Sequence, residues 1–263
     1  MTREIEEKLA KALTAETTEL IPFLPYLLQD LWELGSKPRD IIRLIKKHMT
    51  ISENTTFLDL ACGKGAVSIN IAKELGVNVY GFDLLPDFIT YAKQKAEEWD
   101  VGALCHFIVG DVNEKVNTEK GYDCVIFGAV GDVLGEPKET LQKLSQTIKP
   151  GGFIIIDATY LPDDGSVGDL KWEYEYLHLG DWLRIFKELG LSLVEELADE
   201  EGYDCEYELS VMTRRANELI EKHQEKREMF EGYLQSQRKE MADLEFALLG
   251  GTWILRKGET EVG

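Results

Sequence analysis

The sequence predicts an α/β fold in which a mostly parallel sheet carries helices on both faces. Between residues 55 and 161, strand-length apolar runs alternate with helix-length amphipathic runs, which is the pattern of a doubly wound sheet. The chain has 263 residues, 44% of them hydrophobic and 30% charged. These proportions suit one α/β domain with additions better than two equal domains.

Seven segments are expected to form the strands of this sheet. They are residues 55–61, 78–84, 104–111, 122–130, 152–160, 191–197 and 248–257. Helices are expected to begin at Pro86 and Pro137, because proline is favoured in the first turn of a helix. A further helix is expected to begin near Asp181.

We expect three parts along the chain. Residues 1–54 form an amphipathic helical cap, and residues 55–161 form the core of the fold. Residues 162–263 complete the sheet and carry a helical insertion at about 162–190 and 203–245. The charged run 203–245 lies between the last two strands, which makes it a lid or a contact surface, for example between two copies of the chain.

The composition of the chain disfavours several classes of function. The formal charge of −20 disfavours nucleic acid as a partner, because proteins that bind nucleic acid need a basic surface. The four cysteines form no CxxC pair and the four histidines no HxxxH pair, so no metal site is expected. The amino-terminal segment is charged and lacks a secretory signal pattern, and no apolar run reaches about 18 residues. We expect a cytoplasmic protein without a membrane anchor.

The segment with the clearest chemistry is FLDLACGKGA, residues 57–66. An apolar strand closes on Asp59, and the chain then turns through Gly63 and Gly65 into a helix. Glycine tolerates positive φ and allows close approach to a ligand, and such a turn is expected to present unpaired N–H groups to it. A dinucleotide fingerprint would need a third glycine where Ser68 stands, which disfavours a pyrophosphate ligand.

This segment resembles motif I of the class I S-adenosylmethionine (SAM) dependent methyltransferases, in which an acid is followed by GxGxG. Ala61 replaces the first glycine, whereas Gly63 and Gly65 match. Further matches follow in order along the chain: Asp83 after the second strand, Asp111 after the third, and KPGGFIIID at the fifth. The resemblance implies the class I methyltransferase fold, a Rossmann-like doubly wound sheet of seven strands.

The resemblance also implies which residues contact the cofactor. Asp83 would accept hydrogen bonds from both ribose hydroxyls, as an ionised carboxylate can, and Asp111 and Val112 would face the adenine. The full implied set is Asp59, Ala61, Cys62, Gly63, Gly65, Asp83, Leu84, Asp111, Val112 and Phe127. Helix capping is the alternative interpretation of Asp83 and Asp111, and the Cys62 thiol is interpreted as a small buried hydrophobe.

Methyl transfer is an in-line displacement that depends mainly on placement of the acceptor. Asp132 and Tyr160 are candidate general bases, although structural roles are favoured for both. Trp172, Tyr174 and Tyr176 alternate with acids and could form an aromatic wall for a cationic amine; packing is the favoured explanation. No metal is expected among the site residues.

The carboxyl-terminal third resembles a subgroup of small-molecule methyltransferases related in layout to ubiquinone and menaquinone C-methyltransferases. The expected function is therefore methyl transfer from SAM to a small molecule, with S-adenosylhomocysteine as product. Two alternatives stay open at this point: a non-catalytic SAM-binding regulator, and an oxidoreductase that uses a nucleotide cofactor. The sequence does not identify the acceptor.

Overall fold

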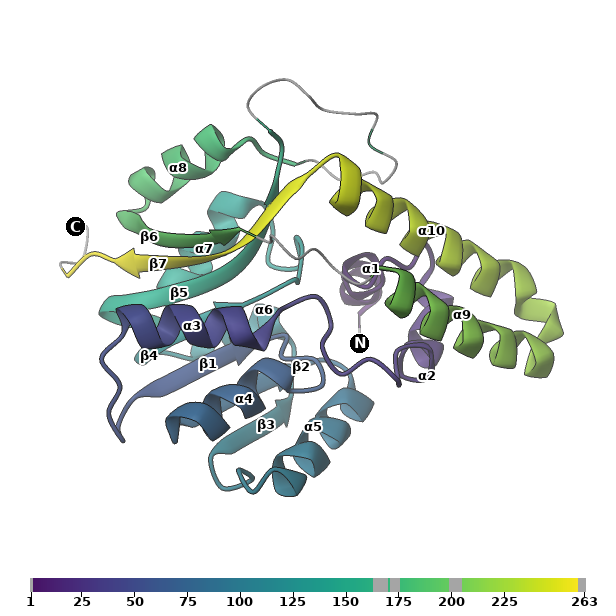
Figure 1. The fold of residues 1–263 in the computed structure, drawn as a ribbon, viewed down its shortest axis with the longest axis horizontal. Helices are drawn as coiled ribbons and strands as arrows, with labels where there is room; N and C mark the ends of the chain where they lie inside the picture. Colours follow the sequence, from purple (N-terminus) through teal and green to yellow (C-terminus); the bar gives the residue numbers. More distant parts are fainter. Residues whose placement is uncertain (1, 163–169, 171–175, 199–204, 260–263) are drawn as a thin grey trace. The chain divides into compact units, whose positions relative to one another are not determined.

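The computed structural model describes residues 2–162, 170, 176–198 and 205–259 (Figure 1). Its strands are β1 (Thr56–Leu60), β2 (Asn78–Asp83), β3 (Cys105–Val109), β4 (Tyr122–Phe127), β5 (Ile148–Tyr160), β6 (Leu191–Ala198) and β7 (Leu249–Lys257). They form one seven-stranded sheet in the order β3-β2-β1-β4-β5-β7-β6. The predicted fold class is confirmed.

The pairing within the sheet fixes where a ligand can approach. β1 pairs in parallel with β2 on one side and with β4 on the other, whereas β6 and β7 are antiparallel. The strand order therefore reverses between β1 and β4. In open α/β sheets, the crevice beyond the carboxyl ends of strands at such a reversal is where ligands bind.

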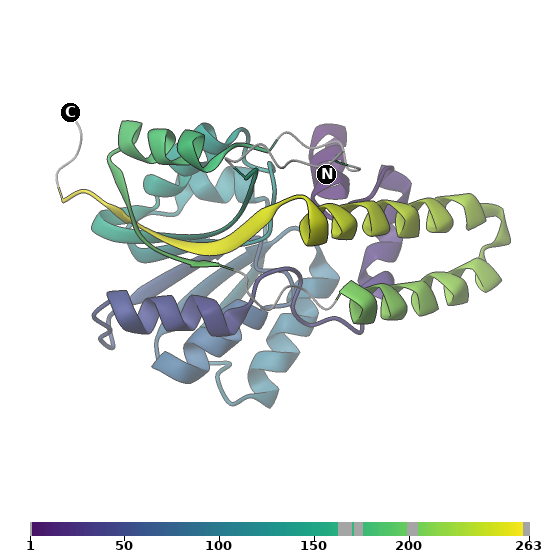
Figure 2. The ribbon, with the colours of Figure 1, turned by 45° about the horizontal axis from the view of Figure 1, so that its top comes forward.

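Six helices accompany the described sheet: α3 (Pro38–His48), α4 (Ala66–Leu75), α5 (Pro86–Glu98), α6 (Val112–Thr118), α7 (Pro137–Ser145) and α8 (Leu179–Glu188). Figures 1 and 2 show α3, α4 and α5 on one face and α7 and α8 on the other. The predicted helix starts at Pro86 and Pro137 are confirmed. Pro38 is the first residue of α3, a further proline in the first turn of a helix.

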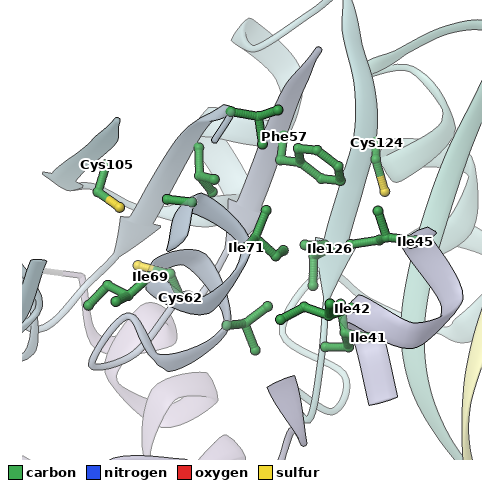
Figure 3. Packing of buried hydrophobic residues seen from close by; sticks show 14 of the residues in the cluster. Ile41, Ile42, Ile45, Phe57, Cys62, Ile69, Ile71, Cys105, Cys124 and Ile126 are labelled. Atoms are coloured by element: carbon green, nitrogen blue, oxygen red, sulfur yellow. The ribbon is translucent and has the colours of Figure 1, made fainter. Parts of the chain in front are cut away.

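A cluster of buried apolar side chains lies between the sheet and helices α3, α4 and α5 (Figure 3). Ile41 and Ile45 of α3, Phe57 of β1 and Ile69 of α4 have no exposed surface. Burial of each such side chain contributes about 1.5–3 kcal/mol. Helix α3 is thus integral to the core around the sheet.

The chain divides into two compact units. The sheet-containing unit comprises Trp32–Ala158, Gly180–Ala198 and Gly251–Gly263; the other comprises Met1–Leu31, Thr159–Leu179 and Asp199–Gly250. The described helices of the second unit are α1 (Arg3–Ala12), η1 (Thr18–Phe23), α2 (Leu24–Leu27), α9 (Cys205–Lys222), η2 (Gln224–Lys226) and α10 (Arg227–Phe246). The three-part division at residues 54 and 161 stays a prediction.

The described residues of the charged run 203–245, from Cys205 onward, form two antiparallel helices, α9 and α10, that lie side by side (Figure 2). The chain reverses at His223, where φ is −134° and ψ is 63°, although no glycine or proline stands there. Apolar side chains of both helices are buried in this unit, among them Met212 and Phe230. Arg215 of α9 also donates to both carboxylate oxygens of Asp30, at 2.6 and 2.8 Å.

In the part of the chain that the structure describes, no helix combines the length and apolar character needed to cross a membrane.

Candidate functional site

The turn between β1 and α4 is the centre of the candidate site. Ala61, Gly63 and Gly65 have φ values of 60°, 52° and 76°, a region that L-residues other than glycine enter at a cost. A Cβ on Gly65 would lie 2.8 Å from Cζ of Phe107 and 2.9 Å from Cβ of Ala92. Glycine at this position is therefore required both by the backbone angle and by the packing of α4.

Three N–H groups of this turn donate hydrogen bonds within the protein, in contrast to the expectation that they are unpaired. Cys62 N–H donates to the Phe82 carbonyl at 3.0 Å, and Gly65 N–H donates to the Cys62 carbonyl at 2.9 Å. Gly63 N–H donates to Oδ2 of Asp83 at 2.9 Å. For these three donors the expectation does not hold, because the tight turn and the neighbouring carboxylate satisfy them. That the first turn of α4 offers unpaired N–H groups stays a prediction.

Asp83 stands at the carboxyl end of β2 and is buried, with 8% of its surface exposed. Its Oδ2 accepts from Gly63 N–H, and its Oδ1 accepts from Leu85 N–H at 2.9 Å. Burial raises the pKa of this carboxyl, and these N–H donors oppose the shift. One carboxylate thus connects the turn after β1 to the chain that enters α5.

Asp59 of β1 lies beneath the turn and is 3% exposed. Burial raises the pKa of this carboxyl to about 7, against a hydrogen bond from the Ser68 hydroxyl at 2.5 Å; the charge of Asp83 raises it further. Ser68, at the position of the third glycine in a dinucleotide fingerprint, is fully buried and serves this carboxylate. Burial also raises the pKa of the Cys62 thiol well above its usual range, so the thiol is unsuited to nucleophilic chemistry.

The remaining residues of the expected cofactor set follow β2, β3 and β4. Asp111 caps α6, because its Oδ1 accepts from Asn113 N–H at 2.8 Å. Val112, the first residue of α6, and Phe127, the last of β4, are buried, whereas Leu84 is half-buried. Asp111 therefore does cap a helix, as the alternative interpretation expects. This hydrogen bond uses Oδ1 and does not prevent Oδ2 from contacting a cofactor.

The residues expected to bind or activate an acceptor belong to different units or lie outside the described residues. Asp132 is half-buried in the loop between β4 and α7. Tyr160 is buried at the end of β5 and, like the half-buried Tyr176, falls in the unit that contains α9 and α10. Trp172 and Tyr174 lie outside the described residues. The described part of the chain contains no group of three His, Cys, Asp or Glu residues that could hold a metal ion.

Several polar residues near the turn escaped the sequence interpretation. Lys64 is buried, with its ammonium 4.6 Å from the centre of the Tyr91 ring of α5. Ser36 donates a hydrogen bond to Asp157 of β5. Of these residues, only Asp157 could have been noticed in the sequence, because it is an acid within the apolar strand GFIIIDATY.

Comparisons with known proteins relate the chain to methyltransferases. A model of the methyltransferase domain family matches residues 51–238. Uncharacterized protein YjhP of Escherichia coli is 31% identical over 165 residues, which cover 59% of this chain and 65% of that protein. Ubiquinone biosynthesis O-methyltransferase of Hydrogenovibrio crunogenus is 31% identical over 114 residues, 43% of this chain and 46% of that protein. The matches thus span about half to two thirds of the length of these relatives.

The fold is shared with solved structures. A SAM-dependent methyltransferase from Geobacter sulfurreducens, crystallised in complex with S-adenosylhomocysteine, superposes with a TM-score of 0.73. The match covers 90% of this chain and 98% of that chain at 20% sequence identity. At that identity, the likeness concerns the fold.

Ala61→Gly is expected to raise the free energy of unfolding by about 1 kcal/mol, because glycine relieves the cost of positive φ at this position. Urea denaturation followed by circular dichroism measures the change. Ala129→Gly, at the alanine with φ 53°, is expected to act in the same way. Ala103→Gly, at an exposed alanine without positive φ, should not stabilise the protein. Equal effects of all three changes would show that backbone strain is not their cause.

Asp59→Asn is expected to stabilise the protein increasingly as pH rises. Since the folded pKa of about 7 exceeds the unfolded pKa of about 4, wild-type stability falls as pH rises between these values. The gain should be near zero at pH 4 and reach at most about 4 kcal/mol above pH 7. Ser68→Ala, which removes a donor to the ionised carboxylate, should have the opposite sign at pH 8. A gain that is independent of pH, measured by urea denaturation, would contradict the assignment.

Proposed function

Because the chain belongs to the class I SAM-dependent methyltransferase family, we propose that it transfers a methyl group from SAM to a small-molecule acceptor. S-adenosylhomocysteine is the second product. The observation that carries the proposal is the buried Asp83 carboxylate, joined to the positive-φ turn at Gly63, where the carboxyl ends of β1 and β2 meet. This is the part of an open sheet where a nucleoside binds.

The chemistry of Asp83 supports its proposed role as the ribose ligand. Each of its two oxygens accepts one backbone N–H, and a carboxylate oxygen can accept more than one donor. The Leu84 backbone also donates to this carboxylate. Since a carboxylate offers about four lone-pair sites, it has capacity for a ligand donor beside these backbone groups. A ribose diol offers two O–H donors at the spacing of a carboxylate, which gives two charge-assisted bonds.

The other proposed cofactor contacts surround this carboxylate. The turn supplies Asp59, Ala61, Cys62, Gly63 and Gly65, and the ends of β2, β3 and β4 supply Leu84, Asp111, Val112 and Phe127. Ala61 and Gly63, both at positive φ, carry no side chain larger than a methyl group, so a ligand can approach the backbone on this side of the turn closely. The residues present therefore fit a nucleoside with an amino acid tail.

SAM supplies a methyl group activated by its sulfonium sulfur. The acceptor atom displaces that sulfur in line, so that the new bond to carbon forms as the carbon–sulfur bond breaks. The residues of the site hold the two reactants in register and exclude water, which accounts for much of the rate. An acceptor that carries a proton also needs a base, for which Asp132 and Tyr160 are the proposed candidates.

The acceptor is proposed to be a small molecule and not a nucleic acid, because a formal charge of −20 repels a polyanion. Trp172, Tyr174 and Tyr176 are retained as a proposed aromatic wall for an acceptor with a cationic amine. We place the reaction in the cytoplasm and regard the helices of the 203–245 segment as a proposed contact between two copies of the chain.

Calorimetric titration with S-adenosylhomocysteine, beside NADH, tests the cofactor class. We expect micromolar binding of S-adenosylhomocysteine and none of NADH. Binding of NADH alone would replace the proposal with a nucleotide-dependent oxidoreductase. Binding of S-adenosylhomocysteine without methyl transfer to any amine or quinone-like phenol would favour the regulatory alternative.

Asp83→Ala is expected to weaken S-adenosylhomocysteine binding by about 2 kcal/mol or more, because two charge-assisted hydrogen bonds are lost. Asp87→Ala serves as a matched control, since Asp87 is an exposed acid in the first turn of the following helix. Asp87→Ala should leave affinity unchanged. Unchanged affinity in a folded Asp83→Ala variant would remove the ribose assignment.

A further inference from the structure

Residues Trp32–Ser36, here called the strap, contain no helix or strand and connect to α3. The strap belongs to the sheet-containing unit. Its two ends contact two different loops at the carboxyl edge of the sheet, one after β1 and one after β4. Since the strand order reverses between β1 and β4, the strap lies at the crevice where a ligand is expected.

The first end of the strap contacts the glycine turn. Trp32 Nε1 donates to the Lys64 carbonyl at 3.2 Å, and the Trp32 ring meets that of Trp99 edge-on with centroids 5.0 Å apart. Leu34 Cδ1 lies 3.4 Å from where a Cβ on Gly63 would stand. The strap therefore reaches the backbone of the proposed cofactor turn itself.

The other end contacts the loop after β4. Gly35 has φ 94°, and a Cβ on it would lie 2.5 Å from Cβ of Ala129, which itself has positive φ. A Cβ on Gly128 would run into the Ser36 hydroxyl and lie 2.6 Å from Oδ2 of Asp157. This close approach leaves little freedom for the strap to shift along the sheet edge.

Asp157 anchors this end. Its Oδ2 accepts from the Ser36 hydroxyl of the strap, and its Oδ1 accepts from the Thr252 hydroxyl of β7 at 2.7 Å. Asp157 is half-buried, so its carboxylate loses part of its hydration and needs hydrogen-bond donors in exchange. The two hydroxyls meet that need, and one of them fixes the strap.

We propose that the strap forms a wall of the cofactor site and that Asp157 is the positioning residue that holds it in place through Ser36. The inference rests on the proposed SAM-binding function. Asp157 acts on the cofactor only through the strap, so its contribution should appear as cofactor affinity and not merely as stability.

The two hydroxyls on Asp157 provide a matched test. Ser36→Ala and Thr252→Val each remove one donor from the same carboxylate, but only Ser36 belongs to the strap. We expect Ser36→Ala to weaken S-adenosylhomocysteine binding about tenfold, as loss of a bond to a charged group implies, with Thr252→Val within about twofold of wild type. Calorimetry gives the affinities, and thermal unfolding shows that both variants lose stability.

A second measurement uses hydrogen exchange of the strap amides in the full chain. S-adenosylhomocysteine should slow exchange of residues 32–36 in wild type and in Thr252→Val, but less in Asp157→Asn, which weakens the anchor while keeping the shape of the side chain. Equal affinities in Ser36→Ala and Thr252→Val, while Asp83→Ala loses affinity, would overturn the strap inference alone. Failure of the wild-type chain to bind S-adenosylhomocysteine would overturn the proposed function and the inference together.

Discussion

The hydrogen bond from Gly63 N–H to the Asp83 carboxylate is the contact on which the candidate site depends. It joins the turn after β1 to the end of β2, and the Leu85 N–H on the other carboxylate oxygen extends the connection toward α5. The bond is possible because the two strands are parallel neighbours, so their carboxyl ends meet. It satisfies a backbone donor of the half-buried Gly63, two residues before Gly65, the N-cap of α4.

Two buried acids, Asp59 and Asp83, lie close enough for the charge of Asp83 to raise the pKa of Asp59. An apolar pair would be cheaper to bury, since ionised carboxylates lose their hydration. The Ser68 hydroxyl and backbone N–H groups offset part of this cost. Buried acids that lower the stability of the fold are typical of functional sites. In this protein Asp59 and Asp83 stand toward the carboxyl ends of β1 and β2.

The local part of this arrangement was predictable from the sequence, and the long-range part was not. Alternating apolar runs indicate strands and helices because their periodicity is local, and the glycine turn follows from Gly63 and Gly65. The positive φ of Ala61 was not predictable, because no feature of the local sequence indicates that an alanine adopts this angle. The reversal at His223 has no glycine or proline to indicate it, because packing between α9 and α10 determines it. The partners Ser36 and Asp157 are 121 positions apart, and no local pattern relates them.

The charges of the proposed site also favour the cofactor before methyl transfer over the cofactor after it. The donors that bind Asp59 and Asp83 are neutral N–H and hydroxyl groups; they satisfy lone pairs but do not cancel charge. A cation in the crevice therefore stabilises both carboxylates when they are ionised, and it lowers the cost of their burial. SAM carries a sulfonium charge that S-adenosylhomocysteine lacks. If the proposed contacts hold, methyl transfer removes the positive charge that these acids attract, and we expect the product to be held less strongly than the substrate for this reason.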